Sequence, residues 1–229
     1  MKICVIYPKV CCKSGALLAS ALGADKCNMS ISDKRDFTEY DVVFSFGSSA
    51  RIKGNTIINS SEAICNCIDK RTTLRILKEN NIPSVAYVLH REDIPDSWDI
   101  IVARIDSMGN QAKSLDFYTD KKDAPIAELY TEYFEHEFEM RIVVFQNRIV
   151  GRYIKEQVGE AWEFVEAQSI GLKVMDNACI KAAAVLGIDY VGFDVVAKDC
   201  EDFAILEANS GATLTDGVAK SIKKYLKGN

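Results

Sequence analysis

The chain has 229 residues, with 28 Lys and Arg against 33 Asp and Glu, a formal net charge of -5, 48% hydrophobic residues and 27% charged residues. This composition is typical of a globular protein and excludes a collagenous, coiled-coil or disordered chain. The mildly acidic balance lacks the clustered basic charge of a nucleic-acid-binding protein, so we expect no direct contact with nucleic acid.

Neither a membrane span nor a disulfide framework is expected. No apolar stretch approaches the roughly 18 residues that a membrane helix needs, and residues 1–8 are too short for a signal-peptide core. We therefore expect a cytoplasmic protein that does not bind membranes. The eight cysteines lack the C-x2-C pairs of a zinc site and are expected to be reduced thiols.

The first part of the chain has the pattern of a small α/β unit. Residues 3–7 and 42–46 are continuous apolar runs typical of buried parallel strands, and residues 15–22 between them predict a short helix. No linker rich in glycine or proline follows. Any lobes of the protein must therefore be interwoven.

One long helix is predicted after the polar cluster at 59–61, whose side chains can cap it. Its apolar positions recur at helical spacing up to residue 77, and it ends before Pro83 because the residue preceding a proline avoids helical geometry. Lys70 lies on this helix. A strand over 100–105 and a polar loop with a single glycine over 107–111 come next.

The rest of the chain is expected to alternate strands and helices. β-rich arms around a short polar turn predict a hairpin, and a glycine after an apolar-periodic segment marks the end of a helix. Two further strands flank an acidic turn, and an amphipathic helix closes the chain. The predicted ranges are 138–145 with 149–154, then 175–186, 191–197 with 203–208, and 218–226.

The two late strands carry the densest cluster of reactive side chains. Residues two apart in a strand project to the same face, so Glu207 and Asn209 point together, and Asp194 joins them if the strands pair. Two carboxylates and an amide oxygen form the hard oxygen site that magnesium uses beside phosphates. In the alternative interpretation, Asp194 bonds backbone amides and the other two merely end the strand. The pattern favours neither, because a buried carboxylate needs pairing in both cases.

Several cations precede this cluster, and any one of them is explained equally well as solvated surface. Their presence together with a magnesium-type site is more informative, because triphosphate transfer needs cations on the phosphates as well as a metal ion. The P-loop, the G-x-G-x-x-G loop and the kinase motifs are absent, which excludes the standard folds built on them. The cations are Lys70, Arg104, Arg141, Arg152 and Lys155.

Six fragments between residues 59 and 214 occur in a characteristic order. They are Asn59-Ser60 with Ala63-Ile64, Asp69-Lys70 and Ile82-Pro83; Ile101-Val102-Ala103-Arg104; Thr131-Glu132-Tyr133-Phe134; Glu139-Met140-Arg141; Val191-Gly192-Phe193-Asp194; and Leu206-Glu207-Ala208-Asn209-Ser210. Together they resemble the ATP-grasp superfamily, and most closely its RimK-like carboxylate-amine ligase branch.

The resemblance implies an α/β (α+β) protein with the ATP-grasp fold, in which ATP lies between two α+β lobes. A small parallel-sheet lobe similar to the pre-ATP-grasp domain would occupy residues 1–60, and the ATP-grasp domain residues 61–229. Within the latter, the small lobe is expected at about 84–131 and the large lobe at about 132–229.

The resemblance also implies site residues, carried over position by position. The metal ligands would be Asp194, Glu207 and Asn209; the nucleotide-binding residues would be Lys70, Arg104, Glu132, Tyr133, Phe134, Glu139 and Lys155; and the catalytic residues would be Arg141, at the transferred phosphate or developing oxyanion, and Arg152, at the substrate acid. His136 fits no H-E-x-x-H zinc pattern, and we expect it to be exposed at a lobe junction.

The implied activity is ATP-dependent formation of an amide or peptide bond through an acyl phosphate, with Mg²⁺ or Mn²⁺ and release of ADP and phosphate. The partners would be a small-molecule or peptide carboxylate and an amine, and a homodimer could complete the cleft of this short chain. Arg104 replaces the usual lysine, and the loop 107–113 has one glycine where the family has two or three. Two different activities therefore stay open: nucleotide binding without turnover, and phosphorylation of a hydroxyl or formation of a thioester.

Overall fold

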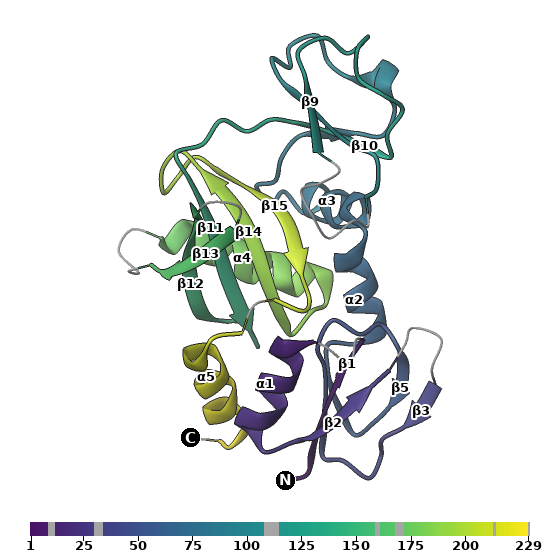
Figure 1. Cartoon of the computed structure of the whole chain (residues 1–229), viewed down its shortest axis with the longest axis vertical. Helices are drawn as coiled ribbons and strands as arrows, with labels where there is room; N and C mark the ends of the chain where they lie inside the picture. The colour runs from purple at the N-terminus through teal and green to yellow at the C-terminus, as the bar shows by residue number, and fades with distance from the viewer. Residues whose placement is uncertain are drawn as a thin grey trace.

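The computed structural model describes residues 1–8, 12–29, 34–107, 115–158, 161–167, 172–212 and 214–228. These residues form mixed α/β architecture with parallel strands near the N-terminus and antiparallel sheets in the remainder (Figure 1). The expected α/β (α+β) class is therefore confirmed. Every cysteine in the described ranges is a free thiol, and no described helix is long and apolar enough to cross a membrane.

The N-terminal segment folds around a parallel sheet with strand order β2-β1-β4-β6, beside a two-stranded parallel pair, β3 and β5. The two predicted strands and the predicted helix are confirmed. The elements are β1 (Ile3–Tyr7), α1 (Lys13–Leu22), β2 (Asp25–Asn28), β3 (Lys34–Asp36), β4 (Val42–Ser45), β5 (Arg51–Lys53) and β6 (Thr56–Ile58).

Two helices, α2 (Ser61–Ile68) and α3 (Lys70–Glu79), replace the single helix predicted from the sequence. The prediction of one helix is wrong at Asp69, whose backbone is extended (φ -88°, ψ 110°) and whose carboxylate accepts a hydrogen bond from the Arg71 amide at 3.0 Å. Such a cap starts a new helix. Lys70 consequently becomes the first residue of α3.

The small sheet is antiparallel, with strand order β7-β10-β8-β9. One of its faces is covered by Ile94, Trp98 and Tyr130. On the other face, Leu129 packs with Leu74 of α3 in a cluster that reaches the large sheet. The elements are β7 (Tyr87–Val88), the 3-10 helix η1 (Arg91–Asp93), β8 (Ile101–Arg104), β9 (Leu115–Tyr118) and β10 (Leu129–Glu132).

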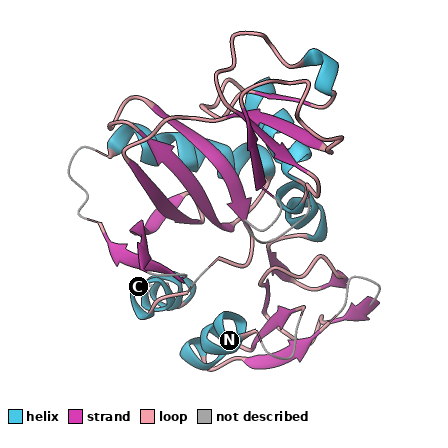
Figure 2. Ribbon diagram, turned by 45° about the horizontal axis from the view of Figure 1, so that its top comes forward, coloured by secondary structure: helices cyan, strands magenta, loops and turns pink. Residues whose placement is uncertain are grey.

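The large sheet is antiparallel, with strand order β13-β12-β11-β14-β15, and α4 covers one of its faces (Figure 2). Both predicted strand pairs and the helix that stops at Gly187 are confirmed. The elements are β11 (Phe138–Phe145), β12 (Arg148–Val158), β13 (Ala161–Glu166), α4 (Lys173–Leu186), β14 (Tyr190–Ala197), β15 (Phe203–Asn209) and the final helix α5 (Asp216–Leu226).

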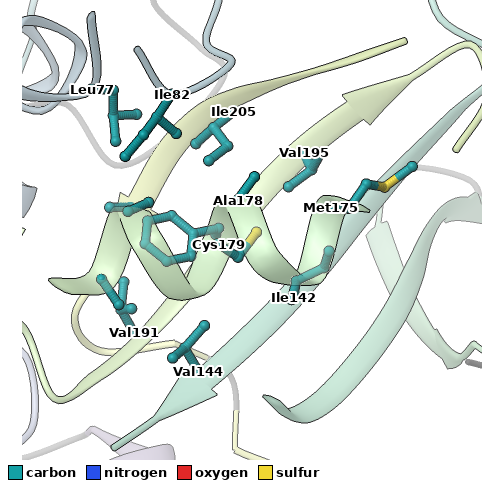
Figure 3. Close-up of a cluster of buried hydrophobic side chains, with 14 of the residues drawn as sticks. Leu77, Ile82, Ile142, Val144, Met175, Ala178, Cys179, Val191, Val195 and Ile205 are labelled. Carbon is teal, nitrogen blue, oxygen red and sulfur yellow. The ribbon is translucent and has the colours of Figure 1, made fainter. Parts of the chain in front are cut away.

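The main hydrophobic core lies between α4 and the large sheet (Figure 3). Side chains of α4 pack there against alternate residues of β11, β14 and β15, and the end of α3 joins the same cluster. The labelled members are Leu77, Ile82, Ile142, Val144, Met175, Ala178, Cys179, Val191, Val195 and Ile205.

The opposite face of the large sheet, here called the open face, is covered around Val196 and Ala204 by α3 and the small sheet, and at its other end by the N-terminal sheet and α5. There the N-terminal sheet and α5 pack on it through aromatic rings, including Phe44, Phe145 and Tyr190. Gly47 has a left-handed backbone (φ +69°), and a Cβ on it would lie 3.3 Å from the Gly211 Cα. This close approach joins the N-terminal segment to the loop after β15. The part of the open face between its two covered ends carries the charged residues described next.

Candidate functional site

Strand alternation places most of the expected site residues on the open face. On β11, Met140 and Ile142 enter the core with α4, so Glu139 and Arg141 project to the other side. The register sets Glu139 opposite Lys155 and Arg141 opposite Asp194, which in turn lies opposite Glu207. Four strands thus bring together residues that are far apart in the sequence.

Asp194 and Arg141 form the central contact of the site. The guanidinium donates from Nε to Oδ1 at 2.6 Å and from Nη2 to Oδ2 at 2.8 Å, and Lys155 Nζ lies 3.3 Å from Oδ2. Asp194 is only 4% exposed. Burial raises the pKa of Asp194, although Arg141 and Lys155 act to lower it. The charge of this carboxylate therefore depends on the two cations beside it.

Glu207 forms a second paired centre. Lys70 Nζ lies 3.3 Å from Glu207 Oε2, and Asn209 Nδ2 donates to Oε1 at 3.0 Å. Burial alone would raise the pKa of Glu207, but Lys70, Asn209 and Arg104 outweigh it and hold that pKa below its ordinary value. Burial also lowers the pKa of Arg104, against the pull of Glu207. Glu207 is thus a stabilised carboxylate between two cations.

This face carries oxygen atoms of the type that a hard divalent cation prefers. Asp194 and Glu207 are direct neighbours across β14 and β15, and Asn209 lies two residues further along β15. The described ranges contain no group of three or more His, Cys, Asp or Glu side chains placed to hold a metal ion. Any ion must therefore take its remaining ligands from the asparagine, water or substrate oxygens, which is how Mg²⁺ binds beside phosphates.

A cleft lies next to these charges, between the small sheet and the large sheet. Its volume of about 110 Å³ is below the roughly 300 to 1,000 Å³ of complete small-molecule sites, so it holds only part of such a ligand. Tyr133 and Phe117 both line it and meet edge to face, with ring centroids 5.9 Å apart. The lining residues are Val102, Arg104, Phe117, Thr131, Glu132, Tyr133, Phe134, His136, Glu139, Val196 and Leu206.

The linker that crosses the cleft is held by its backbone. The Glu132 amide donates to the Ala86 carbonyl at 3.0 Å and the Tyr133 amide to the Ile100 carbonyl at 2.9 Å. Phe134 follows and also lines the cleft. The structure therefore brings together all three expected linker residues, with Arg104 and Glu139 on the walls beside them.

Arg152 is not brought into this group. It lies opposite Ile142 on the α4 side of the large sheet, where its Nε donates to Asp176 Oδ1 of α4 at 2.9 Å. The physical reason is strand alternation: Lys155 is three residues away and faces the open side, so Arg152 must face the other way. The expected contact of Arg152 with a substrate acid has no support in this placement.

Six residues that line the cleft were not assigned to the site from the sequence, among them Phe117 and His136. Phe117 lies on β9 and lines the cleft, and no sequence pattern around it indicates this. The predicted glycine-poor loop before β9 falls mostly on residues 108–114, which lie outside the described ranges. His136 was expected to be exposed, which is wrong: its side chain is 19% exposed and lines the cleft. Its position between the linker and Glu139 was the available signal.

No protein-family model and no curated protein matches the sequence. Solved structures do match over almost the whole chain. The ATP-grasp ligase PsnB, complexed with minimal precursor, Mg and ADP, superposes with a TM-score of 0.69 at 13% identity, covering 99% of this chain and 96% of PsnB. The macrocyclase MdnC from Microcystis aeruginosa MRC, bound with precursor peptide MdnA, gives a TM-score of 0.68 at 10% identity, with 100% of both chains covered.

D-alanine–D-alanine ligase from Bacillus anthracis, complexed with ATP, also matches, with a TM-score of 0.64, 13% identity, and coverage of 100% of this chain and 92% of the ligase. At such identities the likeness establishes the fold alone. The chain has the ATP-grasp fold, as the sequence resemblance implied. The RimK-like branch stays a prediction.

Proposed function

We propose that the protein is an ATP-dependent ligase that joins a carboxylate to an amine, cleaving ATP to ADP and phosphate. The observation that carries this proposal is the convergence of four cations and three carboxylates at the open face, next to a cleft lined by aromatic side chains. The ATP-grasp fold adds support, because the solved structures that share it include several ligases.

The residues along the cleft suggest one orientation for bound Mg-ATP. A base would enter the cleft beside Tyr133 and Phe134, and the phosphates would lie toward Lys70 and Arg104. The expected metal ligands Asp194, Glu207 and Asn209 lie on the same side as these cations. A bound Mg²⁺ or Mn²⁺ would neutralise charge on the phosphate oxygens and orient them for in-line transfer.

The proposed reaction has two steps. A carboxylate oxygen of the acid attacks the γ-phosphorus of ATP and ADP leaves, which gives an acyl phosphate. The amine nitrogen then attacks the acyl carbon, inorganic phosphate leaves, and the nitrogen loses a proton to form the amide. Arg141 would stabilise the negative charge that develops on the transferred group, and water exclusion would protect the acyl phosphate.

The acid and the amine are proposed only as classes. The acid is a small-molecule or peptide carboxylate, and the peptide option draws support from PsnB and MdnC, which are complexed with precursor peptides. The RimK-like ligases are the proposed branch, since the six fragments of the sequence resemble their motifs most closely. We also propose that the protein is cytoplasmic. A homodimer that completes the cleft is a further part of the proposal.

Nucleotide binding without turnover is the second candidate. One observation favours it: the Arg141 fork already engages both carboxylate oxygens of Asp194, which leaves fewer lone pairs for a metal ion. A binder of this kind would hold Mg-ATP tightly and release no phosphate with any acid or amine.

The test combines product identification with two variants. The protein is incubated with Mg-ATP and pooled amino acids or cell extract, products are identified by mass spectrometry, and hydroxylamine is added to trap an acyl phosphate as a hydroxamate. We expect ADP release and a new amide, and loss of both in Asp194→Asn and in Glu207→Gln.

Asp202→Asn is the matched control, because Asp202 is an exposed carboxylate in the turn of the same strand pair. This variant should retain full turnover. Retained turnover in both site variants would refute the metal assignment. Tight Mg-ATP binding without phosphate release would favour the binder. A phosphorylated hydroxyl or a thioester among the products would replace amide formation as the reaction.

A further inference from the structure

A second cavity, here called the edge cavity, lies outside the cleft and is larger than it. Its volume is about 610 Å³, which is within the roughly 300 to 1,000 Å³ of complete small-molecule sites. It lies where the end of α3, the segment 82–86, β7 and the turn after η1 meet, and it shares no lining residue with the cleft. The proposed ligase reaction makes no use of this cavity.

The edge cavity follows the free edge of the small sheet. β7 is the first strand in the order β7-β10-β8-β9, so only one of its sides is paired within this sheet. Tyr87 and Val88 are consecutive in β7 and belong to clusters on opposite faces of the sheet, yet both line the cavity. A cavity that is lined from both faces of a sheet lies along the edge of that sheet.

The backbone beside this edge offers hydrogen-bonding groups that have no partner among the described residues. The Val85 amide donates to the Ile205 carbonyl at 3.4 Å, and the Pro83 carbonyl accepts from the Ile205 amide at 3.1 Å. In such a parallel pairing, the residue between the two bonds directs its own N–H and C=O away from the neighbouring strand. Ser84 is that residue, and it lines the cavity.

Tyr87 offers a second pair of backbone groups. The Glu132 amide donates to the Ala86 carbonyl at 3.0 Å, and this bond flanks the pair of Tyr87 with Thr131 in the antiparallel register. Antiparallel strands alternate bonded and non-bonded pairs, so Tyr87 belongs to a non-bonded pair and directs its N–H and C=O away from β10. An edge with such groups is a template for a further extended segment.

The side chains around the edge cavity are apolar, with one cation among them. Ile82, Val85 and Trp98 line it from buried positions. Lys78 is the one charged side chain among the described residues that line it. Lys78 is exposed and its Nζ lies 5.4 Å from the centroid of the Tyr87 ring, and no described carboxylate forms an ion pair with it. The cavity therefore favours apolar groups next to one negative charge.

We infer that the edge cavity binds an extended peptide segment in which an acidic side chain lies between apolar ones. The backbone of such a peptide supplies the N–H and C=O groups that Ser84 and Tyr87 lack, which is the way a peptide strand adds to the edge of a sheet. Its apolar side chains would fill the space beside Trp98, and its carboxylate would pair with Lys78. A small acid could match the charge of Lys78 but would leave the backbone groups of the edge unpaired.

The test measures the binding of defined peptides to the full-length protein by fluorescence anisotropy. The probe is a blocked, fluorescein-labelled hexapeptide of alternating valine and glutamate. A second hexapeptide has lysine in place of glutamate, and a third carries N-methyl groups on alternate backbone nitrogens, which remove the N–H donors of one edge. We expect the probe to saturate the protein below about 1 mM. The other two peptides should bind at least about tenfold more weakly, since each loses an ion pair or a hydrogen bond.

Lys78→Gln tests the recognition of charge within the protein. This variant should bind the valine–glutamate peptide about tenfold more weakly, because a charge-assisted hydrogen bond is lost. Lys220→Gln, at an exposed lysine of α5, is the matched control and should leave the affinity unchanged. Circular dichroism confirms that both variants are folded.

Absence of saturation by the probe, or equal affinity for the three peptides, would overturn this inference and leave the proposed function standing, because the edge cavity and the cleft share no residue. Displacement of the labelled peptide by benzoate at an equal concentration would mean that the cavity takes a small acid, and would also overturn it. Equal losses in Lys78→Gln and Lys220→Gln would place the peptide on the charged surface in general rather than in this cavity.

Discussion

The two faces of the large sheet are built from the same strands but differ in almost every physical respect. On the α4 face, alternate residues are apolar and nearly inaccessible to solvent, as with Ile142 and Val195. On the open face, the residues next to them are charged and tied into ion pairs, as with Arg141 and Asp194. Consecutive residues of one strand therefore belong alternately to the core and to the candidate site.

The comparison teaches that the precision of the site depends on the core. Burial of charged groups costs free energy unless they are paired in good geometry, and the pairing distances here require that four strands keep their register. That register is held by the packing against α4, since slipping by one residue would exchange the two faces. Changes on the α4 face should therefore alter stability, and changes on the open face should alter binding and turnover.

The largest expected change in the free energy of unfolding comes from a core substitution on the α4 face. Phe193 is fully buried beside Asp194, and Phe193→Ala should lower the free energy of unfolding by about 3 to 5 kcal/mol through lost contacts and the cavity left behind. Urea denaturation monitored by circular dichroism measures this loss. Val165→Ala on β13, where the side chain is 44% exposed, is the control and should change stability little. A loss below that of the control would mean that this core does not hold the sheet.

A smaller change in the free energy of unfolding is expected for a substitution of Arg152, which is a charged residue on the apolar α4 face. Arg152→Gln removes a partly buried ion pair with Asp176 and should lower the free energy of unfolding by about 1 to 3 kcal/mol. Nucleotide affinity, measured by calorimetry, should stay unchanged. Arg141→Gln on the open face should instead reduce turnover. A loss of turnover in Arg152→Gln at full occupancy and intact stability would restore Arg152 to the site.

The sequence predicts much of the difference between the α4 face and the open face, because the alternation of side chains along a strand is a local property. Glu207 and Asn209 are two residues apart, and the structure brings them together as predicted. The odd spacing of Arg152 and Lys155 also predicts that the two side chains face opposite sides of the strand, as the structure has them. The role of Arg152 at the substrate acid rests on the family resemblance alone.

Features that depend on tertiary contacts could not be predicted from the sequence in this way. The break at Asp69 needs a side-chain cap that competes with continuous helical periodicity, and nothing local decides between them. The burial of His136 follows from a cleft between two sheets that are separated along the chain. The large sheet's strand order likewise results from packing rather than from any single segment.

The smallest expected effect concerns Tyr190, where the open face meets the N-terminal sheet. Its hydroxyl is fully buried and has no hydrogen-bond partner among the described residues. Burial raises the pKa of this hydroxyl strongly, so it stays neutral. An unpaired buried polar group is unfavourable, and Tyr190→Phe should therefore raise the free energy of unfolding by up to about 1 kcal/mol, measured by urea denaturation.

Tyr153→Phe is the matched comparison, because the Tyr153 hydroxyl lies 2.6 Å from Thr215 Oγ1 and shares a hydrogen bond with it. Removing that hydroxyl should lower stability by about 0.5 to 1.5 kcal/mol. The two tyrosines belong to one cluster and lose the same atom, so the opposite signs isolate the hydrogen bond itself. Equal losses in both variants would mean that the Tyr190 hydroxyl is satisfied by a bound water or ligand, and that the open face reaches further toward the N-terminal sheet than the charged residues alone indicate.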